Sequence, residues 1–182
     1  DRIFCAVTCN LLVLSTLNGI FEWEIQMSTN VCSFSWQHYR EILEAGKNSG
    51  YKFLLFNEIN GNTAEKYCLL RHDIDFAPEK AIEFGRIEYE LGIRSTYFYQ
   101  IGAWTYNTQE RACSEAIQAL NSMGHQIALH FDATWWEGIS VEELADVCTY
   151  EKDMLARMTD IDISDIVSFH NPHIYADKVI NK

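Results

Sequence analysis

Carboxylate and imidazole side chains gather at the ends of three predicted strands. The strands end in Arg71-His72-Asp73-Ile74-Asp75, in His130-Phe131-Asp132 and in Ser168-Phe169-His170-Asn171-Pro172-His173. Asp73 and Asp75 are two residues apart, so on an extended chain their side chains point the same way. Carboxylates and imidazoles together form the ligand set for zinc or a similar divalent ion. Of two carboxylates on one edge, one can bind the metal while the other serves as a general base.

Each of these residues could also have a purely structural role. Asp75 could cap a helix or form a turn, His130 could be a hydrogen-bonded core residue, and His170 could lie in a turn before Asn-Pro. The functional interpretation gains weight because the three fall at the same end of three strands. We therefore treat them as one candidate site.

Two further histidines and two tryptophans are not expected to be metal ligands. His72 has the opposite strand parity to Asp73, which directs it outward into helix packing. His125 stands at the beginning of its strand, where it is expected to shape the preceding turn. Trp135 and Trp136 directly follow a strand, and they could either stack on a sugar ring or pack under a loop.

The elements that must position these groups follow from the pattern of apolar residues. Strands are expected at 51–56, 67–74, 94–101, 125–131 and 165–169, and helices at 34–49, 79–91, 108–123 and 141–157. Ser140 and Glu143 have the spacing of a capping box, and Gly92 and Gly124 are placed to end helices. Strands alternating with helices in this way predict βαβ units and a parallel sheet.

In parallel α/β folds the chemistry lies at the carboxyl ends of the strands, which is where the candidate residues fall. The sequence has neither G-x-G-x-x-G nor G-x-x-x-x-G-K-[ST]. A dinucleotide site or a P-loop is therefore not expected. A metal site at the carboxyl ends of the strands remains the main hypothesis.

Composition limits the partners and the compartment. The 182 residues suffice for one domain with a core, and 26 acidic against 14 basic residues give a net charge of -12. Such a chain lacks the electrostatic footprint for nucleic acid and is repelled by anionic lipid surfaces. Cys68, Cys113 and Cys148 fall on apolar faces without any C-x-x-C pair, which predicts reduced core thiols and a cytoplasmic location.

The two ends of the chain differ from its middle. Residues 1–26 form an apolar segment that we expect to stand apart from a truncated domain at 27–182. Three interpretations of this segment are open. It could be the signal segment of an exported protein, a membrane span, or sequence upstream of a true start at Met27. We favour the third and expect no stable membrane insertion. The last ten residues contain no closing element, so we expect a fragment.

The stretches RHDID, ELGIRSTYF, GHQIALHFD and SFHNP resemble the polysaccharide deacetylase family (NodB homology domain, carbohydrate esterase family four). The likeness is strongest to a bacterial branch whose first motif is R-H-D-x-D, and it runs from about Ser35 to His173. It implies an α/β fold, an irregular (β/α) barrel of polysaccharide-deacetylase type that is incomplete at the C-terminus. It also implies a metal-dependent hydrolase, with zinc as the expected metal, that removes an acetyl group from an N-acetylated sugar or glycan.

The resemblance assigns roles to single residues. Asp73 corresponds to the general base and Asp75 to a metal ligand. His130 corresponds to the first of two ligand histidines four residues apart, and the second would fall at Thr134. This departure from the family pattern leaves one metal ligand to be found.

Asp132 or His170 is expected to supply that ligand, because a catalytic zinc needs three protein ligands and a water. The family histidine that protonates the leaving amine belongs to a late motif, which would lie beyond Lys182. Within this chain His170 or His173 could replace it, so His170 is a candidate both as ligand and as catalytic acid. Substrate binding is assigned to Arg71, Asp132, Trp135 and Asn171.

A second function stays open. Thr134 and the missing late motif also fit a catalytically inactive deacetylase-like domain that binds carbohydrate or a protein partner. A deacetylase requires bound metal and stops when a chelator is added, whereas a binding module keeps its ligand in chelator.

Overall fold

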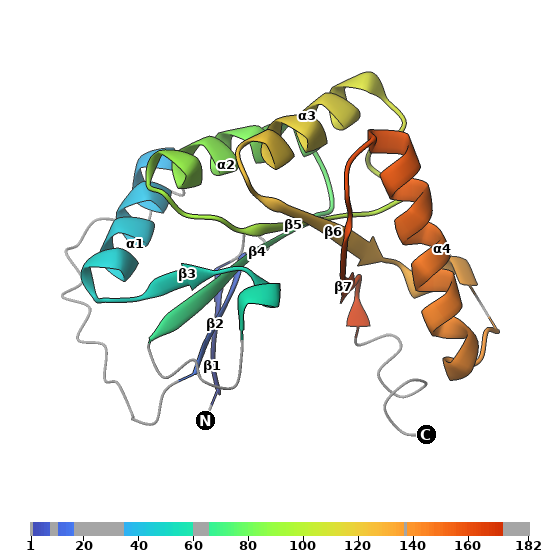
Figure 1. The fold of residues 1–182 in the computed structure, drawn as a ribbon, viewed down its shortest axis with the longest axis horizontal. Coiled ribbons are helices and arrows are strands. Elements are labelled where there is room, and N and C mark those ends of the chain that lie inside the picture. Colours follow the sequence, from blue (N-terminus) through green and yellow to red (C-terminus); the bar gives the residue numbers. More distant parts are fainter. Residues whose placement is uncertain (1, 8–10, 17–34, 60–65, 137, 173–182) are drawn as a thin grey trace.

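The computed structural model describes residues 2–7, 11–16, 35–59, 66–136 and 138–172. Five parallel strands form a curled sheet with the shape of half a barrel (Figure 1). They are β3 (Lys52–Leu54), β4 (Tyr67–Ile74), β5 (Thr96–Tyr99), β6 (Gln126–Phe131) and β7 (Ser164–Phe169). The expected α/β class and parallel sheet are confirmed in this form.

Two further strands extend the sheet beyond β4. β1 (Arg2–Val7) pairs antiparallel with β2 (Leu11–Thr16), and β2 runs antiparallel to β4. Both strands belong to the apolar segment 1–26, whose separation from the domain stays a prediction. No helix in the part of the chain that the structure describes is long and apolar enough to cross a membrane.

Four helices cover the convex side of the sheet (Figure 1). They are α1 (Trp36–Asn48), α2 (Ala81–Glu90), α3 (Arg111–Ser122) and α4 (Val141–Thr159). Ser140 and Glu143 form the predicted capping box before α4, each side chain accepting a hydrogen bond from the other's backbone N–H. Gly92 and Gly124 follow α2 and α3 with φ of 67° and 86°, a conformation that glycine adopts without a steric penalty.

Two elements differ from the predicted ranges. The strand expected at 51–56 ends at Leu54, and a 3-10 turn follows at Phe56–Glu58. The helix expected at 79–91 is divided into a 3-10 turn at Pro78–Lys80 and α2. The preceding Ala77 is left-handed, with φ of 47°, so the chain turns sharply after β4 before helical geometry begins.

Strand parity separates the core from the candidate site. Tyr97, Leu129 and Phe131 are fully buried and belong to the clusters packed under the helices. Burying a side chain of this size contributes roughly 1.5–3 kcal/mol. Residues of the other parity, among them Asp73 and His130, face the concave side. One face of these strands therefore contributes to the hydrophobic core, and the other face carries the side chains of the candidate site.

A buried carboxylate on α2 ties this helix to the sheet. Glu88 is fully buried, and its Oε1 lies 2.6 Å from His72 Nε2 and accepts a hydrogen bond from the Tyr39 hydroxyl. Its Oε2 accepts hydrogen bonds from the hydroxyls of Ser95 and Tyr97, the latter at 2.8 Å. His72 thus faces the helices, as predicted. The burial of Glu88 was not predicted.

Opposing effects act on the pKa of Glu88. Burial alone would raise it, but the charge of His72 and the hydrogen bonds from His72, Ser95 and Tyr39 lower the pKa below its usual value. The carboxylate is therefore held ionised inside the fold. Its stability depends on these partners, because an unpaired buried charge is very costly.

His125 belongs to the same cluster rather than to the turn that precedes it. Its Nδ1 lies 3.1 Å from Ser95 Oγ, and its Nε2 lies 2.9 Å from the carbonyl oxygen of Gly85 in α2. Burial lowers the pKa of the imidazole, although the charge of Glu88 opposes that shift. The expectation that His125 shapes the turn is corrected to a buried contact between α2 and the sheet.

Three cysteines have the character predicted for them. Cys68 and Cys113 are buried, Cys148 is half-buried, and all three are free thiols. Burial raises the pKa of the Cys68 and Cys113 thiols to about 12 and that of Cys148 to about 11. They are protonated at neutral pH and therefore poor nucleophiles.

We predict that Glu88→Ala lowers the free energy of unfolding by about 3–5 kcal/mol, because it leaves four buried polar partners without their acceptor. Urea unfolding measures this loss. Glu83→Ala on the same helix removes an exposed ion pair with Arg86 and should cost less than about 1 kcal/mol. Equal losses in the two variants would show that the buried cluster contributes no more to the free energy of unfolding than an exposed ion pair.

The pH dependence gives a second readout of the same variant. The pKa of Glu88 is lower in the folded chain than its usual 4.5, so its stabilising contribution is complete above pH 4.5. That contribution is lost as the pH falls further towards the folded pKa. The stability difference between the wild type and Glu88→Ala should therefore shrink below pH 4.5.

Candidate metal centre

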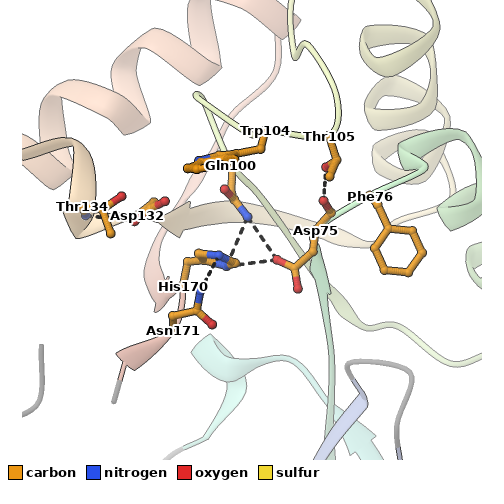
Figure 2. A pocket seen from close by; sticks show the side chains of 9 residues that line it. All are labelled: Asp75, Phe76, Gln100, Trp104, Thr105, Asp132, Thr134, His170 and Asn171. Atoms are coloured by element: carbon orange, nitrogen blue, oxygen red, sulfur yellow. Dashed lines mark hydrogen bonds and ion pairs between the residues drawn. The ribbon is translucent and has the colours of Figure 1, made fainter. Parts of the chain in front are cut away.

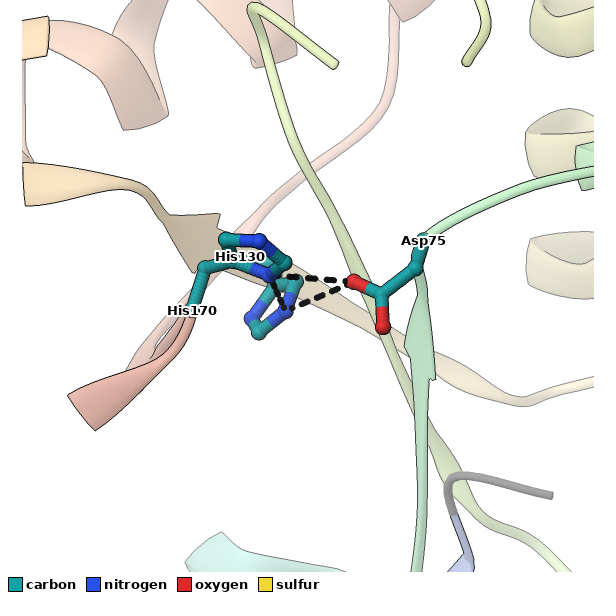
Figure 3. Close-up of side chains that lie close together, drawn as sticks. All are labelled: Asp75, His130 and His170. Atoms are coloured by element: carbon teal, nitrogen blue, oxygen red, sulfur yellow. Dashed lines mark hydrogen bonds and ion pairs between the residues drawn. The ribbon is translucent and has the colours of Figure 1, made fainter. Parts of the chain in front are cut away.

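Three side chains from three strand ends meet on the concave side of the sheet. Asp75 Oδ1 lies 3.2 Å from His130 Nε2 and 3.1 Å from His170 Nδ1. The two imidazole nitrogens are 3.2 Å apart (Figure 3). The three atoms thus form a nearly equilateral triangle, and their residues are those that the sequence grouped as metal ligands.

The size of this triangle suits a small divalent ion. Two ligand atoms that are each about 2.0–2.1 Å from a tetrahedral zinc are separated by roughly 3.3 Å. The observed separations of 3.1–3.2 Å are close to this value. One carboxylate and two imidazoles can therefore hold a metal ion without a large rearrangement, and three protein ligands leave a position for water.

The parallel register explains why these residues meet. Ile74 of β4 lies opposite Tyr99 of β5, and Tyr99 lies opposite Leu129 of β6. The next residue on each chain, Asp75, Gln100 and His130 respectively, therefore comes at one level and on one side of the sheet.

His170 reaches the same level from the neighbouring strand. Ser168 of β7 lies opposite His130, and the His170 backbone N–H donates to the Phe131 carbonyl at 2.8 Å. This hydrogen bond keeps the chain beside β6 for one residue past β7. The two imidazoles are thereby brought together edge to face.

Hydrogen bonds to the far nitrogens orient both imidazoles. His130 Nδ1 lies 3.1 Å from the Ser168 carbonyl oxygen, so Nδ1 carries the proton and Nε2 presents its lone pair to the centre. His170 Nε2 lies 2.8 Å from the amide nitrogen Nδ2 of Asn171. With Nδ1 of His170 as ligand, Nε2 carries its proton, and the amide must turn its oxygen towards it.

Gln100 is a site residue that the sequence analysis did not assign. It is 4% exposed, and its Nε2 donates to Asp75 Oδ1 at 3.0 Å and lies 3.3 Å from His170 Nδ1. The Tyr106 hydroxyl accepts from the Gln100 N–H, and the Thr108 hydroxyl donates to its carbonyl oxygen. The residue is therefore held both at its backbone and at its side-chain amide. Gln100 lies inside the strand expected at 94–101, and an amide is not a typical metal ligand.

Asp73, the expected general base, lies in a separate polar group. Arg71 Nε donates to Asp73 Oδ1 at 3.1 Å, and its Nη2 donates to Oδ2 and to the Ser168 hydroxyl. Ser168 Oγ in turn lies 3.2 Å from Asp73 Oδ1. Arg71 was expected to bind substrate, and in this structure it pairs with Asp73. Its contact with substrate stays a prediction.

A cavity of about 430 Å³ opens beside this candidate metal site (Figure 2). It is lined by Asp75, Phe76, Gln100, Trp104, Thr105, Asp132, Thr134, His170 and Asn171. The size falls within the range of small-molecule sites. The cavity therefore places the predicted ligands Asp75 and His170 in the wall of a space that a substrate could enter.

The remaining predicted residues lie around this cavity in different ways. Asp132 is 6% exposed, lines the cavity and accepts a hydrogen bond from the Thr134 N–H at 2.9 Å. It is not one of the three grouped ligands, so of the two expected alternatives His170 completes the group. Trp135 is exposed and packs against Gly102. His173 lies outside the described residues.

We predict that Gln100→Ala weakens the binding of a divalent ion by about 10- to 100-fold, because it removes a hydrogen bond that orients Asp75. Titration with cobalt(II), followed by its visible absorption, measures the affinity. Gln109→Ala, an exposed glutamine nearby on the chain, should leave the affinity unchanged. An unaltered affinity in Gln100→Ala would show that Asp75 is positioned without the amide.

No protein-family model, no curated protein and no solved structure matches the chain.

Proposed function

We propose that the chain is the hydrolase domain of a zinc-dependent deacetylase, which removes the acetyl group from an N-acetylated sugar or glycan. The observation that carries the proposal is the triangle of Asp75, His130 and His170, with sides of 3.1–3.2 Å, beside a cavity. A second carboxylate, Asp73, precedes Asp75 by two residues on the same side of the chain. The motif resemblance to polysaccharide deacetylases supports the same assignment.

Asp75, His130 and His170 would hold the zinc. A zinc ion bound there supplies Lewis acidity, which polarises a carbonyl and lowers the pKa of a bound water. His170 completes the ligand group in place of the family histidine that Thr134 replaces. The threonine is therefore no argument against a metal, and the proposal favours catalysis over the inactive binding domain.

Asp73 would act on the protons of the reaction. Its carboxylate, paired with Arg71, accepts a proton as water adds to the acetyl carbonyl. When the carbon–nitrogen bond breaks, the departing nitrogen needs a proton. His170 has its Nδ1 in the ligand group, so we assign the return of that proton to Asp73 as well. The products are acetic acid, which ionises to acetate, and the free amine.

We predict roughly one zinc per chain in the purified wild type, because the ligand group forms a single site. Asp75→Ala and His130→Ala should lose the metal, since each removes one of three ligand atoms. Metal analysis of the full chain measures the stoichiometry. His38→Ala and Asp165→Ala change a histidine and an aspartate outside this group and should keep the zinc. Zinc that persists in Asp75→Ala would place the metal elsewhere.

We predict that Asp73→Asn retains the zinc but lowers acetate release by about 10²- to 10⁴-fold, the usual size of a general-base contribution. The amide has nearly the shape of the carboxylate but cannot accept the proton. Acetate released from N-acetylglucosamine oligomers measures the activity, with Asp165→Asn as the control. Full activity in Asp73→Asn would show that the base is wrongly assigned, and no acetate from the zinc-loaded wild type would favour the binding domain.

A further inference from the structure

Asp132 is a buried acid whose negative charge has no counterpart in the protein. It is 6% exposed, and its Oδ1 accepts a hydrogen bond from the Thr134 N–H at 2.9 Å. In the part of the chain that the structure describes, no lysine, arginine or histidine forms an ion pair with it. Burying a carboxylate without a cationic partner is costly, and a positive charge from outside would offset that cost.

The second carboxylate oxygen of Asp132 is open to the cavity. Asp132 lines the cavity, and its Oδ2 has no hydrogen-bond partner among the described residues. Within the same residues, the Tyr99 hydroxyl is the one side-chain polar atom that lacks a partner and is also sealed from solvent. Oδ2 is therefore within reach of a bound molecule. In Figure 2 it lies on the other side of Gln100 from Asp75, so it faces a different part of the cavity from the candidate metal site.

The other groups around the cavity supply no fixed positive charge. Of the nine described residues that line it, none is a lysine or an arginine, and two are the aspartates Asp75 and Asp132. His170 is the one imidazole among them, and its Nδ1 is directed to Asp75. The chain as a whole has a net charge of -12. Such a cavity attracts cations and disfavours anions.

A second acid adjoins Asp132 without lining the cavity. Glu151 of α4 is 8% exposed, and its Oε1 accepts a hydrogen bond from the Trp136 indole N–H. Burial raises the pKa of Glu151, the bond from Trp136 opposes this shift, and the negative charge of Asp132 adds to it. The two acids are thus close enough to interact, and no described cation pairs with either of them. Their joint potential favours a positive charge in the cavity beside Asp132.

The free acceptors suit an ammonium group better than a second metal ion. A metal ion needs several protein ligands, whereas Asp132 offers one free oxygen and lies outside the ligand group. Each N–H of an ammonium group can donate a hydrogen bond, and Asp132, the Thr134 hydroxyl and water can accept these. Thr134 also stands where the family pattern has a histidine, so a shorter side chain leaves room at this wall.

We propose that the cavity binds an N-acetylated amine with a second, free ammonium group, which pairs with Asp132 while the acetamide lies at the candidate metal site. The acetamide end of this proposal rests on the proposed function, and the ammonium end narrows the substrate to positively charged molecules. Two sources share this chemistry, a glucosamine unit joined to an N-acetylated one and an N-acetylated aliphatic diamine. The second source would replace the sugar of the proposed function but keep the reaction.

The test compares two matched pairs of compounds by calorimetry on the full chain. Chelator stops turnover, and slightly acidic buffer keeps both amines protonated. The sugar pair is glucosaminyl-N-acetylglucosamine and glucosyl-N-acetylglucosamine, in which a hydroxyl replaces the ammonium group. The diamine pair is N-acetylputrescine and N-pentylacetamide, in which a methyl group replaces it. We expect the charged member of one pair to bind about 10- to 100-fold more tightly than its neutral member, the range of one hydrogen bond to a charged group.

Asp132→Asn is the decisive variant, because it keeps an oxygen for the Thr134 N–H and removes only the charge. It should bind both members of that pair with similar Kd. Asp165→Asn changes an exposed aspartate outside the cavity and should keep the preference of the wild type. The proposal is overturned if no charged compound binds, if neither pair shows a preference, or if Asp132→Asn retains the preference.

Two further measurements separate ligand binding from other roles of Asp132. Urea unfolding of Asp132→Asn without ligand should show a stability equal to or above that of the wild type, because a buried charge without a cationic partner is removed. Its zinc content should match the wild type, because Asp132 lies outside the ligand group. A loss of stability would make the carboxylate a structural residue, and a loss of zinc would make it a metal ligand. Either result would overturn the proposal.

The same samples distinguish this proposal from the hydrolase assignment. A charge preference that depends on Asp132, in a chain that neither holds zinc nor releases acetate, would support the ammonium site and refute the hydrolase. Zinc-dependent acetate release without a preference between the members of either pair would do the reverse.

Discussion

The backbone register of β4, β5 and β6 is the constraint on which the candidate site depends. It places the residue after β4, the residue after β5 and a residue near the end of β6 at one level. A slip of one residue would turn Asp75 or His130 towards the helices, because neighbouring strand residues face opposite sides. The spacing of 3.1–3.2 Å between ligand atoms is thus a consequence of parallel pairing, refined by hydrogen bonds from Gln100 and to Ser168.

β4 connects this site to the interior on the opposite side of the sheet. His72 is held from behind by Glu88, while Asp73 and Asp75 face the concave side. Compared with well-packed apolar side chains, a buried ion pair of this kind adds little net stability, since desolvation offsets the attraction; only the loss of one partner is costly. It does restrict how the strand can rotate or slide against α2. Anchoring β4 in this way also fixes the position of Asp75 relative to the two imidazoles of the candidate site.

Much of this arrangement could be predicted, because strand periodicity and the placement of strand ends are local properties. Asp75, His130 and His170 were grouped on that basis, and the structure brings them together. Gln100 was missed because its role depends on a neighbour 25 residues away, and an amide carries no chemical signal of its own. Glu88 was missed because its partners lie on α1, β4 and β5, and a glutamate in an amphipathic helix is usually solvated. Long-range partners cannot be read from local pattern.

The two neighbouring carboxylates show how one short motif can divide its chemistry. Asp73 and Asp75 share a side of the chain, but Asp73 meets the permanent positive charge of Arg71, while Asp75 meets two imidazoles. A guanidinium already neutralises the first, so a metal cation gains more beside the second, where neutral nitrogens add lone pairs. In the proposed reaction, Asp73 is the carboxylate that exchanges a proton. The difference between the two proposed roles therefore follows from the neighbours and not from the residue type.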